Sequence, residues 1–113
     1  MATGSIAELM TDDEYKRKVE HSAEPVVVTF LSPLDDKCKA VASKIEELSG
    51  EFTTIKFYQV DVRKHAMLSR ALSNTELPIV VFVENGKDVL TLTSDVSRSR
   101  IREGLQILQT VSC

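Results

Sequence analysis

Cys38 is the residue of this sequence whose type and surroundings together could support redox chemistry. It follows an apolar, β-branched run at 26–31 and a Pro-containing turn, and it lies just inside a segment that favours a helix. A thiol at a helix N-terminus is favoured as a thiolate. The position three residues earlier, where a Cys-x-x-Cys redox motif would carry its other thiol, holds Asp35. The segment therefore has the setting of a redox site with a single thiol.

Cys38 also has a purely structural interpretation. It begins an apolar stripe at helical spacing, which continues with Val41, Ile45 and Leu48. Small buried thiols are common in such stripes. The charges nearby are mixed, because lysines at 37 and 39 favour a thiolate whereas aspartates at 35 and 36 oppose it. The residues alone leave both interpretations open.

The hydrophobic pattern around this segment predicts alternating strands and helices. Strands are expected at 5–10, 25–31, 53–62, 79–83 and 88–93, and helices at 11–21, 35–48, 64–72 and 97–109. The unbroken valine run at 26–28 is typical of a central strand that is buried on both faces. Asn85-Gly86 predicts a hairpin turn. We therefore expect one α/β domain over 1–113, in the order β-α-β-α-β-α-β-β-α, with a central mixed sheet flanked by helices on both faces.

Composition excludes several classes of function. The 113 residues carry a net charge of -3 and no block of Lys and Arg with interleaved aromatics, so we expect no nucleic-acid partner. No apolar run approaches the roughly 20 residues of a membrane span, and residues 1–5 lack the features of a signal peptide. Two cysteines far apart suit a reducing compartment, which indicates a cytoplasmic protein. His21 and His65 lie in no metal-ligand pattern, so neither a metal nor a cofactor is expected.

Over nearly its whole length the chain resembles the thioredoxin family. Residues 30–39 match the family's Phe-Trp-Ala-Pro-Trp-Cys-Gly-Pro-Cys-Lys segment, and Leu77-Pro78-Ile79 matches its Ile-Pro-Thr. Residues 82–86 match its Phe-x-x-Gly hairpin with one extra residue, and 60–62 match the end of its third strand. The resemblance implies the thioredoxin fold. It also implies that Pro78 is the cis-proline facing the active-site turn.

The departures from the family pattern fall on the residues that perform its chemistry. Asp35 occupies the place of the nucleophilic cysteine, and Cys38 that of the resolving cysteine. Thr29 replaces the family's buried aspartate, and Phe57 replaces the lysine that some members place near it. Leucines replace the two aromatic residues that flank the turn. By this resemblance the chain is not expected to be a dithiol–disulfide oxidoreductase, because a carboxylate cannot attack a disulfide as a thiolate does.

The leading hypothesis is a redox-inactive or redox-impaired module that binds a protein through the former substrate groove. The residues expected to line this groove are Leu34, Asp35, Asp36, Lys37, Leu77, Pro78, Ser94 and Asp95. Asp35, Asp36, Glu76 and Asp95 would make its rim acidic apart from Lys37, so we expect an extended peptide segment with basic side chains.

Two other functions remain open at the level of sequence. In the first, Cys38 acts as a catalytic or sensing monothiol through glutathionylation, slow thiol transfer or redox sensing. In the second, the domain is purely structural, and an exposed Cys113 could link two copies as a homodimer.

Overall fold

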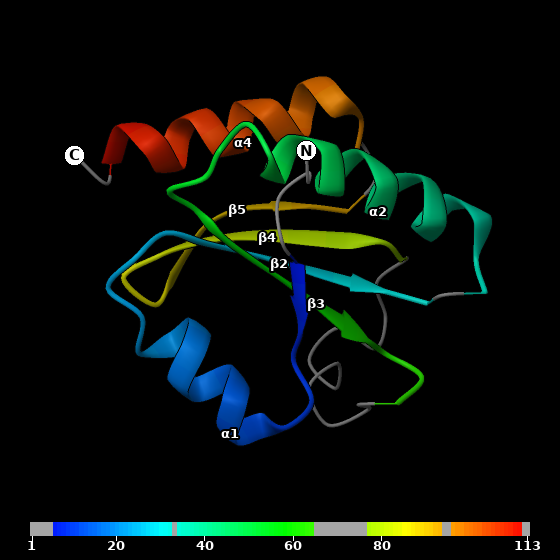
Figure 1. Cartoon of the computed structure of the whole chain (residues 1–113), viewed down its shortest axis with the longest axis horizontal. Coiled ribbons are helices and arrows are strands. Elements are labelled where there is room, and N and C mark those ends of the chain that lie inside the picture. Colours follow the sequence, from blue (N-terminus) through cyan, green and yellow to red (C-terminus); the bar gives the residue numbers. More distant parts are fainter. Residues whose placement is uncertain (1–5, 33, 65–76, 94–95, 112–113) are drawn as a thin grey trace.

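The computed structural model describes residues 6–32, 34–64, 77–93 and 96–111. Their strands form one mixed sheet in the order β1-β3-β2-β4-β5 (Figure 1). The strands are β1 (Ile6–Glu8), β2 (Val26–Leu31), β3 (Lys56–Asp61), β4 (Ile79–Glu84) and β5 (Lys87–Leu92). β1, β3 and β2 run parallel to one another, whereas β4 is antiparallel to both β2 and β5. The predicted mixed α/β sheet is therefore confirmed.

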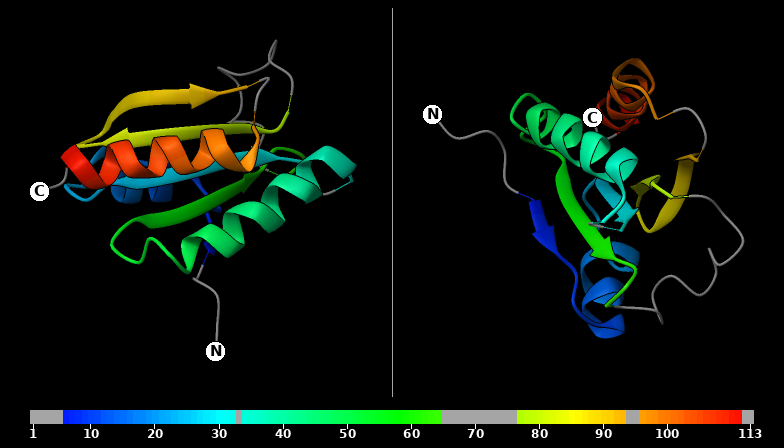
Figure 2. Two further views of the ribbon diagram at one scale, coloured as in Figure 1. Left: turned by 90° about the horizontal axis from the view of Figure 1, so that it is seen from above. Right: turned by 90° about the vertical axis from the view of Figure 1, so that its right-hand side faces the viewer.

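Helices cover both faces of this sheet. They are α1 (Asp12–Tyr15), which continues as the π-helical turn η1 (Lys16–Glu20), then α2 (Asp36–Ser49) and α4 (Arg98–Val111). α2 and α4 lie on one face and α1 on the other (Figures 1 and 2). None of the helices in the described parts of the chain is long and apolar enough to cross a membrane. The helix predicted at 64–72 falls almost wholly outside the described residues.

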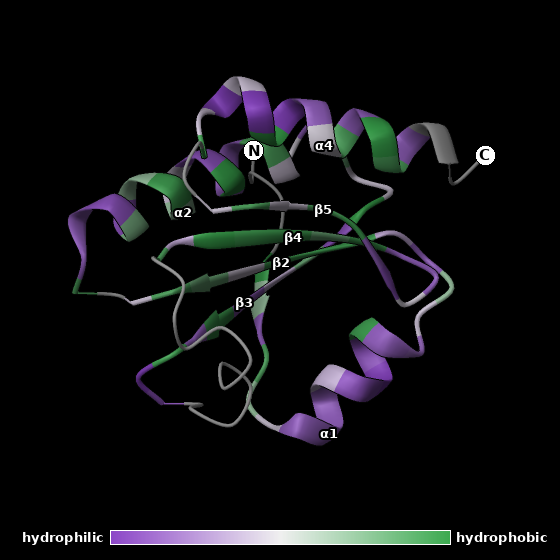
Figure 3. Cartoon of the chain, turned by 180° about the vertical axis from the view of Figure 1, so that it is seen from behind, coloured by the Kyte–Doolittle hydropathy of each residue, from purple (hydrophilic) through white to green (hydrophobic). Residues whose placement is uncertain are grey.

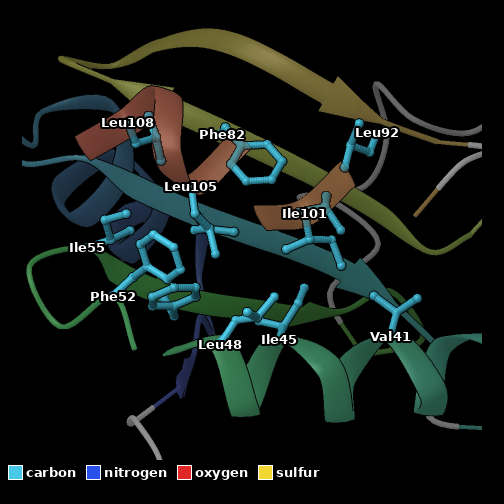
Figure 4. Packing of buried hydrophobic residues seen from close by; sticks show 13 residues of the cluster. Val41, Ile45, Leu48, Phe52, Ile55, Phe82, Leu92, Ile101, Leu105 and Leu108 are labelled. Carbon is cyan, nitrogen blue, oxygen red and sulfur yellow. The ribbon is translucent and has the colours of Figure 1, made fainter. Parts of the chain in front are cut away.

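β2 is the centre of the sheet, and all six of its residues are buried. Its side chains alternate between the faces, so Val27 joins the core beneath α2 and α4 while Val28 joins the core above α1. Figure 3 shows the corresponding contrast between apolar central strands and a polar α1. In the first core, Ile45 of α2 and Leu105 of α4 point into the same interior (Figure 4). The burial of β2 on both faces, which the valine run predicted, is therefore confirmed.

The structure corrects two of the predicted segments. The strand expected from 53 begins only at Lys56, because residues 52–55 form a turn in which the N–H of Ile55 donates to the carbonyl of Phe52 (3.2 Å). The helix expected at 11–21 is α-helical only to Tyr15 and then widens into η1.

The start of that helix was predicted more closely. Thr11 Oγ1 accepts from the N–H of Glu14 (3.1 Å), as a capping box requires. The Glu14 carboxylate, however, reaches one residue further back and accepts from the N–H of Met10 (2.7 Å).

Two glycines allow the chain to pack closely. In the predicted hairpin turn Asn85 and Gly86 both have positive φ, 53° and 78°, and a side chain at Gly86 would collide with the carbonyl of Glu20. Gly104 lies in α4 directly over β4, where an added Cβ would be 2.5 Å from the ring of Phe82. Because glycine is a weak helix former, its residue type alone marks Gly104 only as a weak point in α4. The structure shows that it makes room for a completely buried ring.

We predict that Gly104→Ala lowers the free energy of unfolding by about 1–2 kcal/mol, although alanine is the better helix former, because the overpacking outweighs the propensity gain. Urea denaturation of the variant measures this. Phe82→Leu should create space for the new methyl group, so the double variant should lose less stability than the two single variants together. Strict additivity would show that the ring does not oppose a side chain at 104.

Candidate functional site

Asp35 is the N-cap of α2. Its backbone is extended (φ -94°, ψ 127°), and its Oδ1 accepts from the N–H groups of Lys37 (2.8 Å) and Cys38 (3.3 Å). These are two of the N–H groups that a helix leaves without a partner at its start. Asp36 is the first helical residue, is exposed, and adds negative charge to the positive end of the helix dipole. The prediction that one of these aspartates lies at the helix start is confirmed, and the structure assigns the cap to Asp35.

Cys38 is fully buried, one turn into α2. Burial raises the pKa of its thiol above the ordinary value. The N–H of Ser32, which donates to Cys38 Sγ (3.4 Å), lowers the pKa in part, while the nearby carboxylate of Asp35 raises it further. The thiol is therefore protonated at neutral pH. A neutral, solvent-inaccessible thiol matches the structural interpretation of this residue.

Thr29 lies in the middle of β2, paired with Gln59 of β3 and Val80 of β4. It alternates with Val27 and therefore faces α2 and α4. Its side chain is 2% exposed, and its Oγ1 has no hydrogen-bond partner among the described residues. Phe57 of β3 packs into the core on the same face. Neither side chain can take up or release a proton near neutral pH.

A groove with a volume of about 300 Å³ lies between α2, the segment before β4 and the segment before α4. One wall contains the cis peptide bond Leu77-Pro78. The groove is lined by Lys37, Ala40, Val41, Lys44, Leu77, Pro78, Thr93, Val96 and Ser97. We call it the α2–α4 groove.

The structure brings together three of the residues predicted for this groove, namely Lys37, Leu77 and Pro78. Leu34 is 72% exposed and does not line it, and neither do the two aspartates at 35 and 36. Ser94, Asp95 and Glu76 lie outside the described residues, as does Cys113.

Sequence reasoning missed the residues that α2 adds to the groove. Ala40, Val41 and Lys44 follow Lys37 at intervals of three, four and seven residues, which places them on one face of the helix. This helical spacing was the signal that could have identified them. The contributions of Val96 and Ser97 depend on the path of the chain between β5 and α4, which no local pattern specifies.

Comparison with known proteins identifies the family. The family model described as "Thioredoxin" matches residues 6–107. This chain belongs to the thioredoxin family. Thioredoxin Asp f 28 of Aspergillus fumigatus is 29% identical over 104 residues, which cover 92% of this chain and 94% of the relative. The thioredoxin structure of Fasciola hepatica aligns with a TM-score of 0.80 at 25% identity, over 89% of this chain and 97% of that one.

A more distant relative is a protein named as a monothiol glutaredoxin. Monothiol glutaredoxin-S17 of Arabidopsis thaliana is 28% identical over 90 residues, which cover 80% of this chain but only 18% of that protein.

With the family shown and the sheet order observed, the predicted thioredoxin fold is confirmed.

We predict that Asp35→Ala destabilises this thioredoxin-family protein by about 1 kcal/mol, because two N–H groups at the start of α2 lose their acceptor. Urea denaturation measures the loss. Asp35→Asn should retain most of the stability, since asparagine caps helices equally well. Asp36→Ala is the matched control and should have a smaller effect. An equal loss in the two alanine variants would contradict the assignment of the cap to Asp35.

We predict that Cys38 in the native protein resists alkylation by iodoacetamide at neutral pH and reacts readily in urea. A Cys113→Ser background leaves Cys38 as the single thiol. Rapid alkylation of the folded protein would contradict the buried thiol.

The same thiol also predicts a pH dependence of stability. Because folding raises the pKa of Cys38, its contribution to stability should be fully present below the ordinary thiol value of about 9 and should decline as the pH rises above it. Cys38→Ala in the same background should lack that decline.

Proposed function

We propose that this chain is a thioredoxin-family protein with a degenerate active site, which binds another protein rather than exchanging disulfides. The observation that carries the proposal is the arrangement at the start of α2. The N–H groups of Lys37 and Cys38 donate to the carboxylate of Asp35, and the thiol of Cys38 is buried and neutral. Dithiol exchange requires an accessible thiolate that attacks a disulfide sulfur. A capping carboxylate does not supply one.

The surroundings of Cys38 support the same conclusion. In dithiol exchange the second thiol must lose its proton before it can resolve the mixed disulfide. Thr29 and Phe57, the residues beneath α2 at the positions where the family resemblance places a proton relay, cannot carry a proton. The buried Thr29 hydroxyl lacks a partner among the described residues. Loss of the nucleophile and loss of the relay therefore coincide.

The α2–α4 groove supports the proposed binding of another protein. The α2–α4 groove combines the apolar side chains of Val41, Leu77 and Val96 with an open shape. Among the described residues, no turn or loop hydrogen bond engages the backbone of Leu77. An extended peptide could therefore pair with that backbone as an added strand. We propose a protein segment in extended conformation as the ligand.

The monothiol alternative depends on the accessibility of Cys38. Glutathionylation and redox sensing both require a thiol that solvent can reach. The complete burial of Cys38 and the raised pKa of its thiol count against that role. A cytoplasmic location and a homodimer through Cys113 remain predictions from the sequence.

We predict that the purified protein does not reduce insulin disulfides with dithiothreitol or with a thioredoxin reductase. Turnover like that of an ordinary thioredoxin, measured by insulin precipitation, would refute the proposal. Asp35→Cys should form a disulfide with Cys38 but reduce insulin only sluggishly, because Thr29 and Phe57 cannot move the resolving proton. Asp35→Cys with Thr29→Asp should be faster than Asp35→Cys alone. Full activity of the single variant would show that the relay is dispensable.

A further inference from the structure

We propose that the α2–α4 groove selects an acidic partner, namely an extended protein segment that places glutamate or aspartate side chains against Lys37 and Lys44. This inference rests on the proposed function, because it assumes that the groove holds a peptide. It adds the chemistry of the ligand.

The two lysines supply the charge of the groove. Lys37 and Lys44 are the charged side chains among the nine described residues that line it, and the remaining side chains are apolar or carry only a hydroxyl. Within the described parts of the chain, no carboxylate forms an ion pair with either ammonium group. An apolar floor with two unneutralised cations at its rim is complementary to an amphipathic, acidic segment.

The spacing of the lysines suits an extended chain. Seven residues along a helix separate their Cα atoms by about 10 Å. In an extended peptide the side chains on one face are about 7 Å apart. Because a lysine side chain is long and flexible, two acidic residues separated by one residue can reach both ammonium groups. The side chain between them then points away from the lysines.

Elsewhere between α2 and α4, two arginines of α4 form ion pairs with glutamates. Arg98 pairs with Glu47 (2.5 Å), and Arg102 pairs with Glu51 (2.8 Å). These pairs join α4 to the second half of α2 and to the turn that follows it. Lys37 and Lys44, by contrast, have no described ion-pair partner. The two lysines of α2 that line the groove are therefore available to an acidic ligand.

The start of α4 contributes charge of the same sign. Ser97 lines the groove and caps this helix, with its Oγ accepting from the N–H of Arg100 (3.3 Å). The first turn of α4 has no acidic residue to offset the positive end of the helix dipole. A carboxylate in the groove would therefore meet positive potential from both of its helical walls.

The sequence alone predicts a basic ligand, and that prediction counted four carboxylates on the rim. Asp35 is engaged in capping, and Asp36 does not line the groove. Glu76 and Asp95 lie outside the described residues, so the basic ligand stays a prediction. A binding experiment with acidic and basic peptides separates the two possibilities.

The probes are three extended peptides, capped at both ends, in which valine alternates with glutamate, lysine or glutamine. Titrations are followed by amide NMR of the isotopically labelled full-length protein. We expect the glutamate peptide to bind more tightly than the other two, with amide shifts at Lys37, Lys44 and Val96, and with affinity that falls as salt is added. Lys37→Glu with Lys44→Glu should weaken it by about tenfold or more and favour the lysine peptide.

The matched control is Lys39→Glu with Lys16→Glu, which changes the net charge equally at exposed residues outside the groove. This control should leave the binding site and the order of peptide affinities unchanged. Preference of the native protein for the lysine or the glutamine peptide, with shifts in the groove, would overturn the acidic ligand but support the groove as a binding site. If none of the peptides shifts the groove amides, the proposed function itself fails.

Discussion

The burial of β2 on both faces is the constraint on which this structure depends. A strand whose six residues are all inaccessible needs a neighbour on each edge and a helical layer on each face. β3 and β4 pair with the two edges of β2, α2 and α4 cover one face of the sheet, and α1 covers the other (Figure 2). The turn that follows β2 then delivers the chain to α2 at the rim of the sheet. Position 35 is thus placed at a helix N-terminus by the core of the protein, whatever residue occupies it.

The sequence predicted the features that depend on local chemistry. The valine run indicated the central strand, Asn85-Gly86 the hairpin, and the aspartates at 35 and 36 the start of α2, because in each case the residue type favours one conformation directly. The change to a π-helical turn after Tyr15 could not be predicted in this way. It lies where Val19 packs into the core and Glu20 meets the hairpin turn at Gly86, so distant segments determine the local geometry.

The candidate site shows the same division. The start of α2 at an aspartate and the place of Pro78 in the groove wall followed from the sequence. The other residues that α2 adds to the groove did not, because that lining depends on which side chains of the helix share a face. Asp35 and Asp36 adjoin Lys37 in the sequence, yet the helix directs Lys37 and Lys44 together into the groove and leaves both aspartates out of it. A count of charges along the sequence does not show which of these neighbouring side chains face the groove.

The cap at Asp35 also links the stability of α2 to the residue type at position 35. A carboxylate accepts two N–H groups at the start of α2, and a thiol is a weaker acceptor of the same bonds. A cysteine at this position would therefore weaken the cap while it introduced a nucleophile. The same two backbone N–H groups thus couple the strength of the helix start to the chemistry that its first side chain can offer.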